Sequence, residues 1–267
     1  MSLKKALDEE AARKKISRDW LILSILSDHV DLSVHTVFQV STSGALVAGV
    51  YDKEVTVATL LEHGNFGLGT FAGLDGEMVV LDGRAYQAQG SGKVTEATAE
   101  AGAPFAVITA FSPDATGSLP SVISFADLEA KCDALRNSDN IFYALRLHGH
   151  FPYVKARVVN PPAPGTALAE AAKSQSEFVF EDVEGTLVGI WSPSFASAFS
   201  VEGYHFHFIS DDRQHGGHVL DVRADTLAFA IEALSDYRLV LPETEAYLKA
   251  NLHRDIAAEL NAAERGH

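Results

Sequence analysis

Three histidines in segment 203–222, GYHFHFISDDRQHGGHVLDV, have types and spacing that suit a metal ion. His205 and His207 flank one aromatic residue in an apolar run, so on a strand both side chains would project from the same face. If residues 211–214 reverse the chain, the return strand brings His218 within cross-strand contact distance of that pair. Three imidazole ligands leave a fourth position open, which is typical of catalytic rather than structural zinc sites.

The other histidines near hairpins are expected to be ordinary polar residues. A single histidine on a strand is more often hydrogen-bonded or exposed than a metal ligand. His215 lies within the expected turn, where we predict that it is exposed. His148 and His150 flank a glycine in LRLHGHFPYV, which we interpret as the tip of a hairpin with arms at 141–147 and 153–159.

Composition narrows the classes of protein that this chain can belong to. Its 267 residues are 47% apolar, enough to bury a sizeable core. A formal net charge of −15 argues against binding to nucleic acid or to acidic membrane surfaces, since both require a basic footprint. The single cysteine, Cys132, excludes an internal disulfide and fits a reducing compartment. The N-terminal segment has too many charges for a signal peptide, so we predict a cytoplasmic protein.

Turn and cap signals predict the elements that position the histidines. Asp75-Gly76 and Asp82-Gly83 bracket the apolar run EMVVL, which predicts a β-meander. Residues 105–112 are typical of a further strand, and Ser124 is expected to cap a helix. Residues 227–231 alternate as a strand does, although their alanine-rich composition leaves a helix open. Hairpins rather than helical crossovers join the predicted strands, so the fold class is α+β, rich in β-structure, with helices at the termini and in the middle.

Proline and glycine residues predict where regular structure stops. The segment 160–165, NPPAPG, is the best candidate for a boundary between an N-terminal half, 1–160, and a C-terminal half, 161–267. A turn is expected around Glu184-Gly185, and a final helix is expected to follow Pro242 and to continue nearly to the end. The C-terminal half would then contain the three-histidine metal site.

Several segments resemble the alpha-acetolactate decarboxylase family, from about residue 35 to the C-terminus. They are VFQVSTSGALVAGVYDKEVTV, HGNFGLGTFAGLDGEMVVLDGRAYQ, FYALRLHGHFPYVKARVV, VEGTLVGIWSP and GYHFHFISDDRQHGGHVLD. The resemblance implies zinc-dependent conversion of (S)-2-acetolactate, a 2-hydroxy-3-keto acid, to (R)-acetoin and carbon dioxide. It also implies a mixed sheet in the N-terminal half, barrel-like antiparallel β-structure in the C-terminal half, and a homodimer.

The resemblance also implies which residues form the active site. The zinc ligands would be His205, His207 and His218. The catalytic residues would be Arg157, Glu77 and Glu264, and Thr70 would bind substrate. Glu264 is the nearest equivalent of a family glutamate close to the C-terminus, and Glu259 is the alternative. This chain departs from the family at His148-Gly149, where an Asp-Gly pair is usual.

The chemistry of decarboxylation requires residues of these types. Loss of carbon dioxide leaves an electron pair that the neighbouring ketone accepts, giving an enediolate. Zinc would chelate the ketone and hydroxyl oxygens and stabilise this charge as a Lewis acid. The fork of Arg157 would hold the carboxylate or a polarised oxygen, which a lysine could not reproduce. Glu77 and Glu264 would transfer protons, in an order that the sequence leaves open.

Two other functions fit paired histidines on a strand. A cupin-like oxygenase or isomerase usually has a glutamate a few residues later and a distant third histidine. Here Asp211 and Asp212 stand where that acid would be, and the third histidine follows in the same hairpin. A non-catalytic metal-binding protein would instead close the site with a fourth protein ligand.

Overall fold

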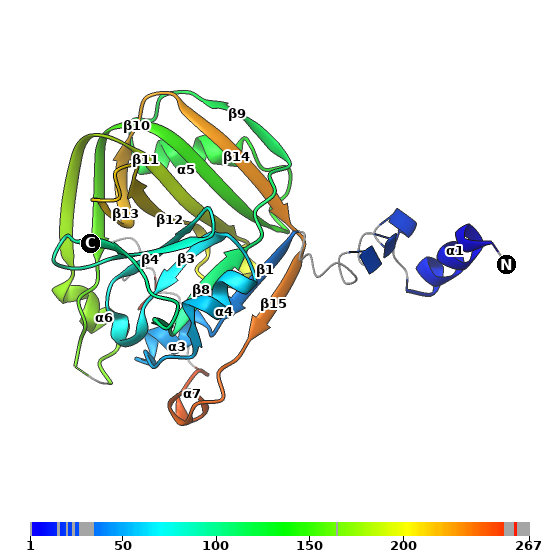
Figure 1. The fold of residues 1–267 in the computed structure, drawn as a ribbon, viewed down its shortest axis with the longest axis horizontal. Coiled ribbons are helices and arrows are strands. Elements are labelled where there is room, and N and C mark those ends of the chain that lie inside the picture. Colours follow the sequence, from blue (N-terminus) through cyan, green and yellow to red (C-terminus); the bar gives the residue numbers. More distant parts are fainter. Residues whose placement is uncertain are drawn as a thin grey trace. The chain divides into compact units, whose positions relative to one another are not determined.

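The chain consists of two compact units, Met1–Val34 and His35–His267, in a computed structural model. The residues described are 2–14, 17–19, 21–22, 25–26, 35–163, 165–253 and 259–260. In the first unit, α1 (Leu3–Lys14) is the helix expected at the N-terminus, with ion pairs such as Glu10–Arg13 along its exposed surface. The second unit contains the sheets shown in Figure 1.

A seven-stranded mixed sheet is built mainly from the N-terminal part of this unit. Its order is β15-β1-β8-β3-β4-β5-β6, and only the β1–β15 pair is parallel. Its strands are β1 (Thr36–Val40), β3 (Phe66–Thr70), β4 (Glu77–Leu81), β5 (Arg84–Ala88), β6 (Val94–Glu96), β8 (Phe105–Thr109) and β15 (Asp236–Val240). The predicted meander is confirmed, because Asp82 and Gly83, with φ of 52° and 75°, form the tight turn between β4 and β5.

A short helix covers the face of this sheet that points away from the second sheet. The helix α4 (Val57–Glu62) packs Leu60 against Met78 and Val80 of β4, which face away from the second sheet. The helix α3 (Ser43–Val47) follows β1, and its Leu46 and Val47 belong to the apolar cluster between the two sheets. The Thr42 side chain accepts a hydrogen bond from the Ala45 amide, and this cap favours a helix over a strand. A separate two-stranded ribbon joins β2 (Val55–Thr56) to β7 (Gly102–Ala103).

The second sheet is antiparallel and closes on itself. Its strands are β9 (Ala115–Leu119), β10 (Phe142–Val158), β11 (Ser176–Ser192), β12 (Gly203–Ser210), β13 (Gly216–Arg223) and β14 (Leu227–Leu234). β10 pairs with β11, β11 with β12, β12 with β13 and β13 again with β10, which makes a ring; β14 and β9 extend it from β10. The predicted combination of a mixed sheet and barrel-like antiparallel β-structure is confirmed.

The barrel is filled by a helix and by one face of its own strands. Ser124 caps α5 (Phe125–Asp133) as predicted, and the strands of the barrel curve around this helix (Figure 1). Leu128 and Cys132 of α5 pack with apolar residues of the barrel such as Phe206 of β12. Since side chains alternate along a strand, the neighbours of Phe206 on β12, His205 and His207, point to the other face of the barrel wall.

Two expected turns are wrong. Gly149 and Gly185 lie opposite each other within the continuous β10–β11 ladder, so neither residue reverses the chain. A Cβ on Gly149 would lie 3.0 Å from Leu227 Cδ2, and a Cβ on Gly185 would lie 2.6 Å from the Phe208 ring. These glycines permit close approach of neighbouring groups, a second reason for glycine in a strand. His148 and His150 therefore lie in mid-strand and not at a hairpin tip.

The chain passes from one sheet to the other more than once. Regular structure stops after β10, as predicted, and resumes at α6 (Leu168–Ala171). β9 and β10 precede this break and β15 follows it, so each sheet takes strands from both sides; the division at residue 160 stays a prediction. The helix expected after Pro242 is shorter than predicted, because α7 (Glu245–Lys249) ends at Ala250, whose ψ is 141°. Within the described ranges, no helix has the length and apolarity needed to cross a membrane.

Candidate metal centre

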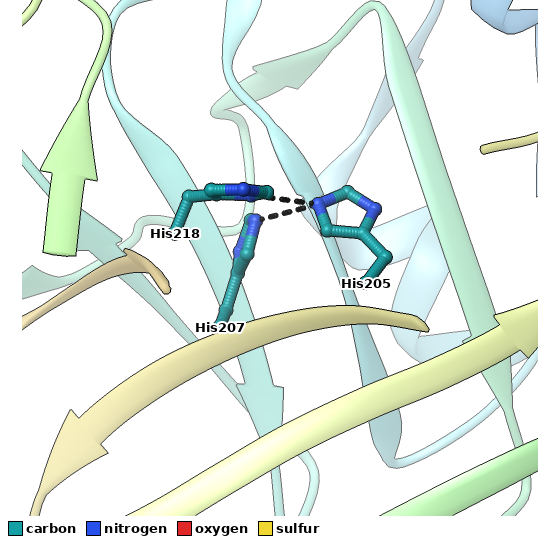
Figure 2. A group of neighbouring side chains, drawn as sticks. All are labelled: His205, His207 and His218. Carbon is teal, nitrogen blue, oxygen red and sulfur yellow. Dashed lines mark hydrogen bonds between the residues drawn. The ribbon is translucent and has the colours of Figure 1, made fainter. Parts of the chain in front are cut away.

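The three predicted histidines converge on the face of β12 and β13 that points away from the barrel interior. His205 and His207 lie two residues apart on β12, and His218 on β13 is the direct cross-strand partner of His207. Their rings turn toward one another (Figure 2). His205 Nε2 lies 3.1 Å from His207 Nε2 and 3.0 Å from His218 Nδ1. All three side chains are buried, with exposed fractions of 8%, 1% and 4%.

Burial keeps the imidazoles of His205 and His207 neutral. Desolvation lowers the pKa of His207 to about 3, and it lowers the pKa of His205 well below its ordinary value. His207 Nδ1 lies 2.8 Å from the Met78 carbonyl oxygen, which can only accept, so the ring proton is on Nδ1. The lone pair of His207 Nε2 therefore points at the other two rings, as in a metal ligand oriented by a backbone carbonyl.

The three nitrogens fit a divalent metal ion. They lie within 4.8 Å of one another, and in the part of the chain that the structure describes they are the one such group of potential ligands. Ligands at 2.0–2.1 Å around a tetrahedral zinc ion are separated by about 3.3 Å, close to the observed spacings. Neutral imidazoles suit zinc and several other first-row ions.

Glu77 and Arg157 form a buried ion pair beside the histidines. Arg157 Nη1 lies 3.2 Å from Glu77 Oε1, and both side chains are more than nine-tenths buried. The second carboxylate oxygen, Oε2, lies 3.7 Å from His207 Nε2. Glu77 begins β4 of the mixed sheet, whereas Arg157 lies on β10 of the barrel. The centre is therefore assembled between the two sheets and not inside the barrel.

Comparison with known proteins gives the family. The family model for alpha-acetolactate decarboxylase matches residues 37–254. The chain belongs to the alpha-acetolactate decarboxylase family. As a member it is a carboxy-lyase, which confirms the resemblance found in the sequence. The decarboxylase of Methanosarcina mazei is 39% identical over 245 residues, which cover 91% of this chain and 85% of that relative. The decarboxylase of Methylococcus capsulatus is 40% identical, covering 86% of this chain and 89% of the relative.

Crystal structures of decarboxylases share the fold. The alpha-acetolactate decarboxylase of Bacillus subtilis strain 168 superposes with a TM-score of 0.83 at 35% identity, covering 86% of this chain and 99% of that chain. A protein from Staphylococcus aureus, described as similar to alpha-acetolactate decarboxylase, superposes with a TM-score of 0.82 at 33% identity.

The remaining residues predicted for the active site are Thr70 and a glutamate near the C-terminus. Thr70 ends β3 directly opposite Glu77, and its hydroxyl donates to the Gly76 carbonyl at 2.7 Å. Glu264 lies outside the described residues. Glu259, its alternative, is half-buried beside Leu260, which belongs to the apolar cluster between the sheets.

Sequence reasoning missed the backbone of β4. The Met78 carbonyl orients His207, although Met78 lies 129 positions earlier in the chain. No property of a methionine side chain marks this role. Only the packing of β4 against the barrel wall, which the sequence does not show, reveals this role.

Proposed function

We propose that this decarboxylase converts (S)-2-acetolactate to (R)-acetoin and carbon dioxide at the three-histidine centre, with zinc as its metal. The observation that supports this most strongly is the convergence of three buried imidazoles beside the buried Glu77–Arg157 pair. A zinc ion held by His205 Nε2, His207 Nε2 and His218 Nδ1 would supply Lewis-acid stabilisation of negative charge on the substrate oxygens.

Arg157 binds and orients the substrate in this proposal. Its guanidinium is permanently charged and can hold the substrate carboxylate or a polarised oxygen through two parallel hydrogen bonds. Because Arg157 is buried, such contacts would form away from competing water. Its ion pair with Glu77 limits the orientations of both side chains.

Glu77 and Glu264 move protons in this proposal. The bond from C2 to the carboxylate carbon breaks, carbon dioxide leaves, and the electron pair moves to the neighbouring ketone to give an enediolate. One glutamate accepts the hydroxyl proton and gives it back to that oxygen at the end, while the other donates a proton to carbon, so the product is neutral acetoin. Glu77 Oε2 faces the histidines, which supports a role for Glu77 at the reacting oxygens. Thr70 donates its proton to Gly76, so toward substrate it would offer a hydrogen-bond acceptor.

The proposal also covers the oligomeric state of the enzyme and its location in the cell. We propose a homodimer from the family resemblance, which sedimentation would test. We also propose a cytoplasmic location, supported by the single cysteine, Cys132, which is buried and has no disulfide partner.

The decisive experiment is direct. Purified protein reconstituted with zinc is mixed with racemic acetolactate, and chiral chromatography follows the acetoin formed. We expect (R)-acetoin and carbon dioxide far above the spontaneous rate, with the metal-stripped protein inactive. Acetolactate decaying at its spontaneous rate with loaded protein would contradict the proposal. Oxygen uptake with a keto acid and ferrous iron would instead support a cupin-like oxygenase.

A further inference from the structure

The backbone turn that precedes Glu77 is strained. Gly73, Leu74 and Gly76 have φ of 73°, 58° and 95°, in the left-handed region that non-glycine residues such as Leu74 rarely adopt. Between them, Asp75 has φ −84° and ψ 68°, and the Gly76 amide donates to the Leu74 carbonyl at 3.0 Å. This is an inverse γ-turn. Such a backbone persists only where surrounding contacts hold it in place.

One side chain on the neighbouring strand holds this turn. Gln87 on β5 donates from Nε2 to the Asp75 carbonyl at 2.6 Å and to Asp75 Oδ2, 3.2 Å away. Both partners are acceptors, so only the N–H end of the amide fits here. From the other side, Thr70 donates to the Gly76 carbonyl, and the Gly73 amide donates to Tyr51.

The turn leads directly into the groups that face the metal centre. Glu77 follows it and contacts Arg157 and His207 through its carboxylate. The next residue, Met78, orients His207 through its carbonyl and pairs with Gln87 in the β4–β5 ladder. A shift of the turn would therefore move the Glu77 carboxylate relative to Arg157.

We propose that Gln87 is a positioning residue of this enzyme: its amide clamps the 73–76 turn and so fixes the Glu77 carboxylate. Gln87 donates its hydrogen bonds to Asp75 and acts on Glu77 through the backbone of this turn. The catalytic consequence rests on the proposed function, whereas the clamp itself does not. Misplacement of a reacting group by about 1 Å can cost about 10²-fold in rate.

The competing explanation is that Gln87 only fills space, and Gln87→Glu separates the two. Glutamate keeps the size of the side chain but turns an acceptor oxygen toward two acceptors, so the clamp is lost while packing is kept. Gln87→Met removes the donor without adding a charge. Gln175→Glu is the matched control, because the Gln175 amide donates to Glu177 at 3.0 Å, far along the chain from the turn.

Two readouts test the clamp. Hydrogen–deuterium exchange of a peptide covering residues 71–80 should be faster in Gln87→Glu and Gln87→Met, and unchanged in Gln175→Glu. With acetolactate, both Gln87 variants should lose roughly tenfold or more in kcat, with zinc content retained and KM little changed.

Unchanged exchange in the two Gln87 variants would overturn the proposal, and so would a wild-type kcat in Gln87→Glu. If Gln87→Glu fails to fold, Gln87→Met gives the decision on the same two criteria. If the wild type itself does not turn over acetolactate, the proposed function fails, and the exchange measurement still decides whether the clamp exists.

Discussion

Arg157 and His218 are direct cross-strand partners in the β10–β13 ladder. The register shifts between Lys155 and Ala156, where a bulge lets β13 advance by one residue. Without this bulge, Arg157 would stand opposite Val219 and not opposite a histidine. A β-bulge beside an active site re-aims side chains in this way. The arginine and one candidate metal ligand are thus held together by strand pairing.

Replacing His207 by alanine should remove the metal. Two remaining imidazoles bind zinc far more weakly than three, and Met78 would lose its partner. We expect metal content to fall from about one ion per chain to near zero by elemental analysis, with loss of acetoin formation. His215→Ala is the control, since His215 lies in the same hairpin but its ring packs at a tilt against Phe180. Full metal content in His207→Ala would refute the centre.

Glu77→Gln should separate metal binding from turnover. The amide keeps the shape of the carboxylate and leaves three histidine ligands in place, but it cannot accept a proton. We expect kcat to fall by about 10²–10⁴-fold while zinc content is retained. Glu96→Gln, an exposed substitution on β6, should have no effect on kcat. Wild-type kcat in Glu77→Gln would remove Glu77 from the proton-transfer scheme.

Arg157→Lys should lower kcat/KM although the positive charge is kept. A lysine cannot present two parallel N–H donors, so we expect a loss of roughly 10- to 100-fold. Steady-state kinetics would measure it. Arg146→Lys serves as control, because Arg146 pairs with Asp82 at the surface of the same strand. Equal kinetics for the two lysine variants would show that charge alone matters at position 157.

Glu232→Gln should stabilise the protein at high pH. Burial raises the pKa of Glu232 on β14 to about 7, although His35 Nδ1 lies 3.2 Å from Oε1 and the Ser112 amide donates to Oε2. Below pH 4.5 the carboxyl group is neutral in both the folded and the unfolded protein, so folding costs nothing for its charge. As pH rises through about 7 the buried group must ionise, and this stabilisation of the folded state is lost. The free energy of unfolding of the variant should exceed that of the wild type by on the order of 1–3 kcal/mol near pH 8, and the two should be equal near pH 4.5. Urea unfolding at both pH values measures these free energies. The same difference between variant and wild type at pH 8 and at pH 4.5 would contradict the prediction.

His150→Gln should destabilise the protein mainly at low pH. Hydrogen bonds to Asp225 and to Asp182, each 2.8 Å long, raise the pKa of His150. The stabilisation is therefore complete below pH 6.5 and is lost as pH rises through the higher folded value. Thermal melts should show a larger loss of Tm near pH 5.5 than near pH 8.5. Asp225→Asn should reproduce the pattern, and a loss independent of pH would exclude the ion pairs as its source.

The histidine hairpin was predictable because its information is local. Alternation along β12 and a polar reversal are enough to place His205, His207 and His218 together. The Glu77–Arg157 contact joins residues 80 positions apart on different sheets, so no local pattern reveals it. Only the family resemblance pointed to these two residues.

The two wrongly predicted turns share one physical origin. Glycine serves both chain reversal and close packing, and sequence alone does not distinguish the two uses. At Asp82-Gly83 a reversal is correct, whereas at Gly149 and Gly185 two long strands continue through. The neighbours that decide between these outcomes, Leu227 and Phe208, lie elsewhere in the chain.

The parallel pairing of β1 with β15 has a consequence for biosynthesis. Thr36 pairs with Asp236, so β1 gains this neighbour only after 200 further residues have been synthesised. Contacts of such long sequence separation form slowly, because a long loop must close first. We therefore expect the nascent chain to emerge with β1 lacking one neighbour, so that this edge of the mixed sheet is completed only once β15 has left the ribosome.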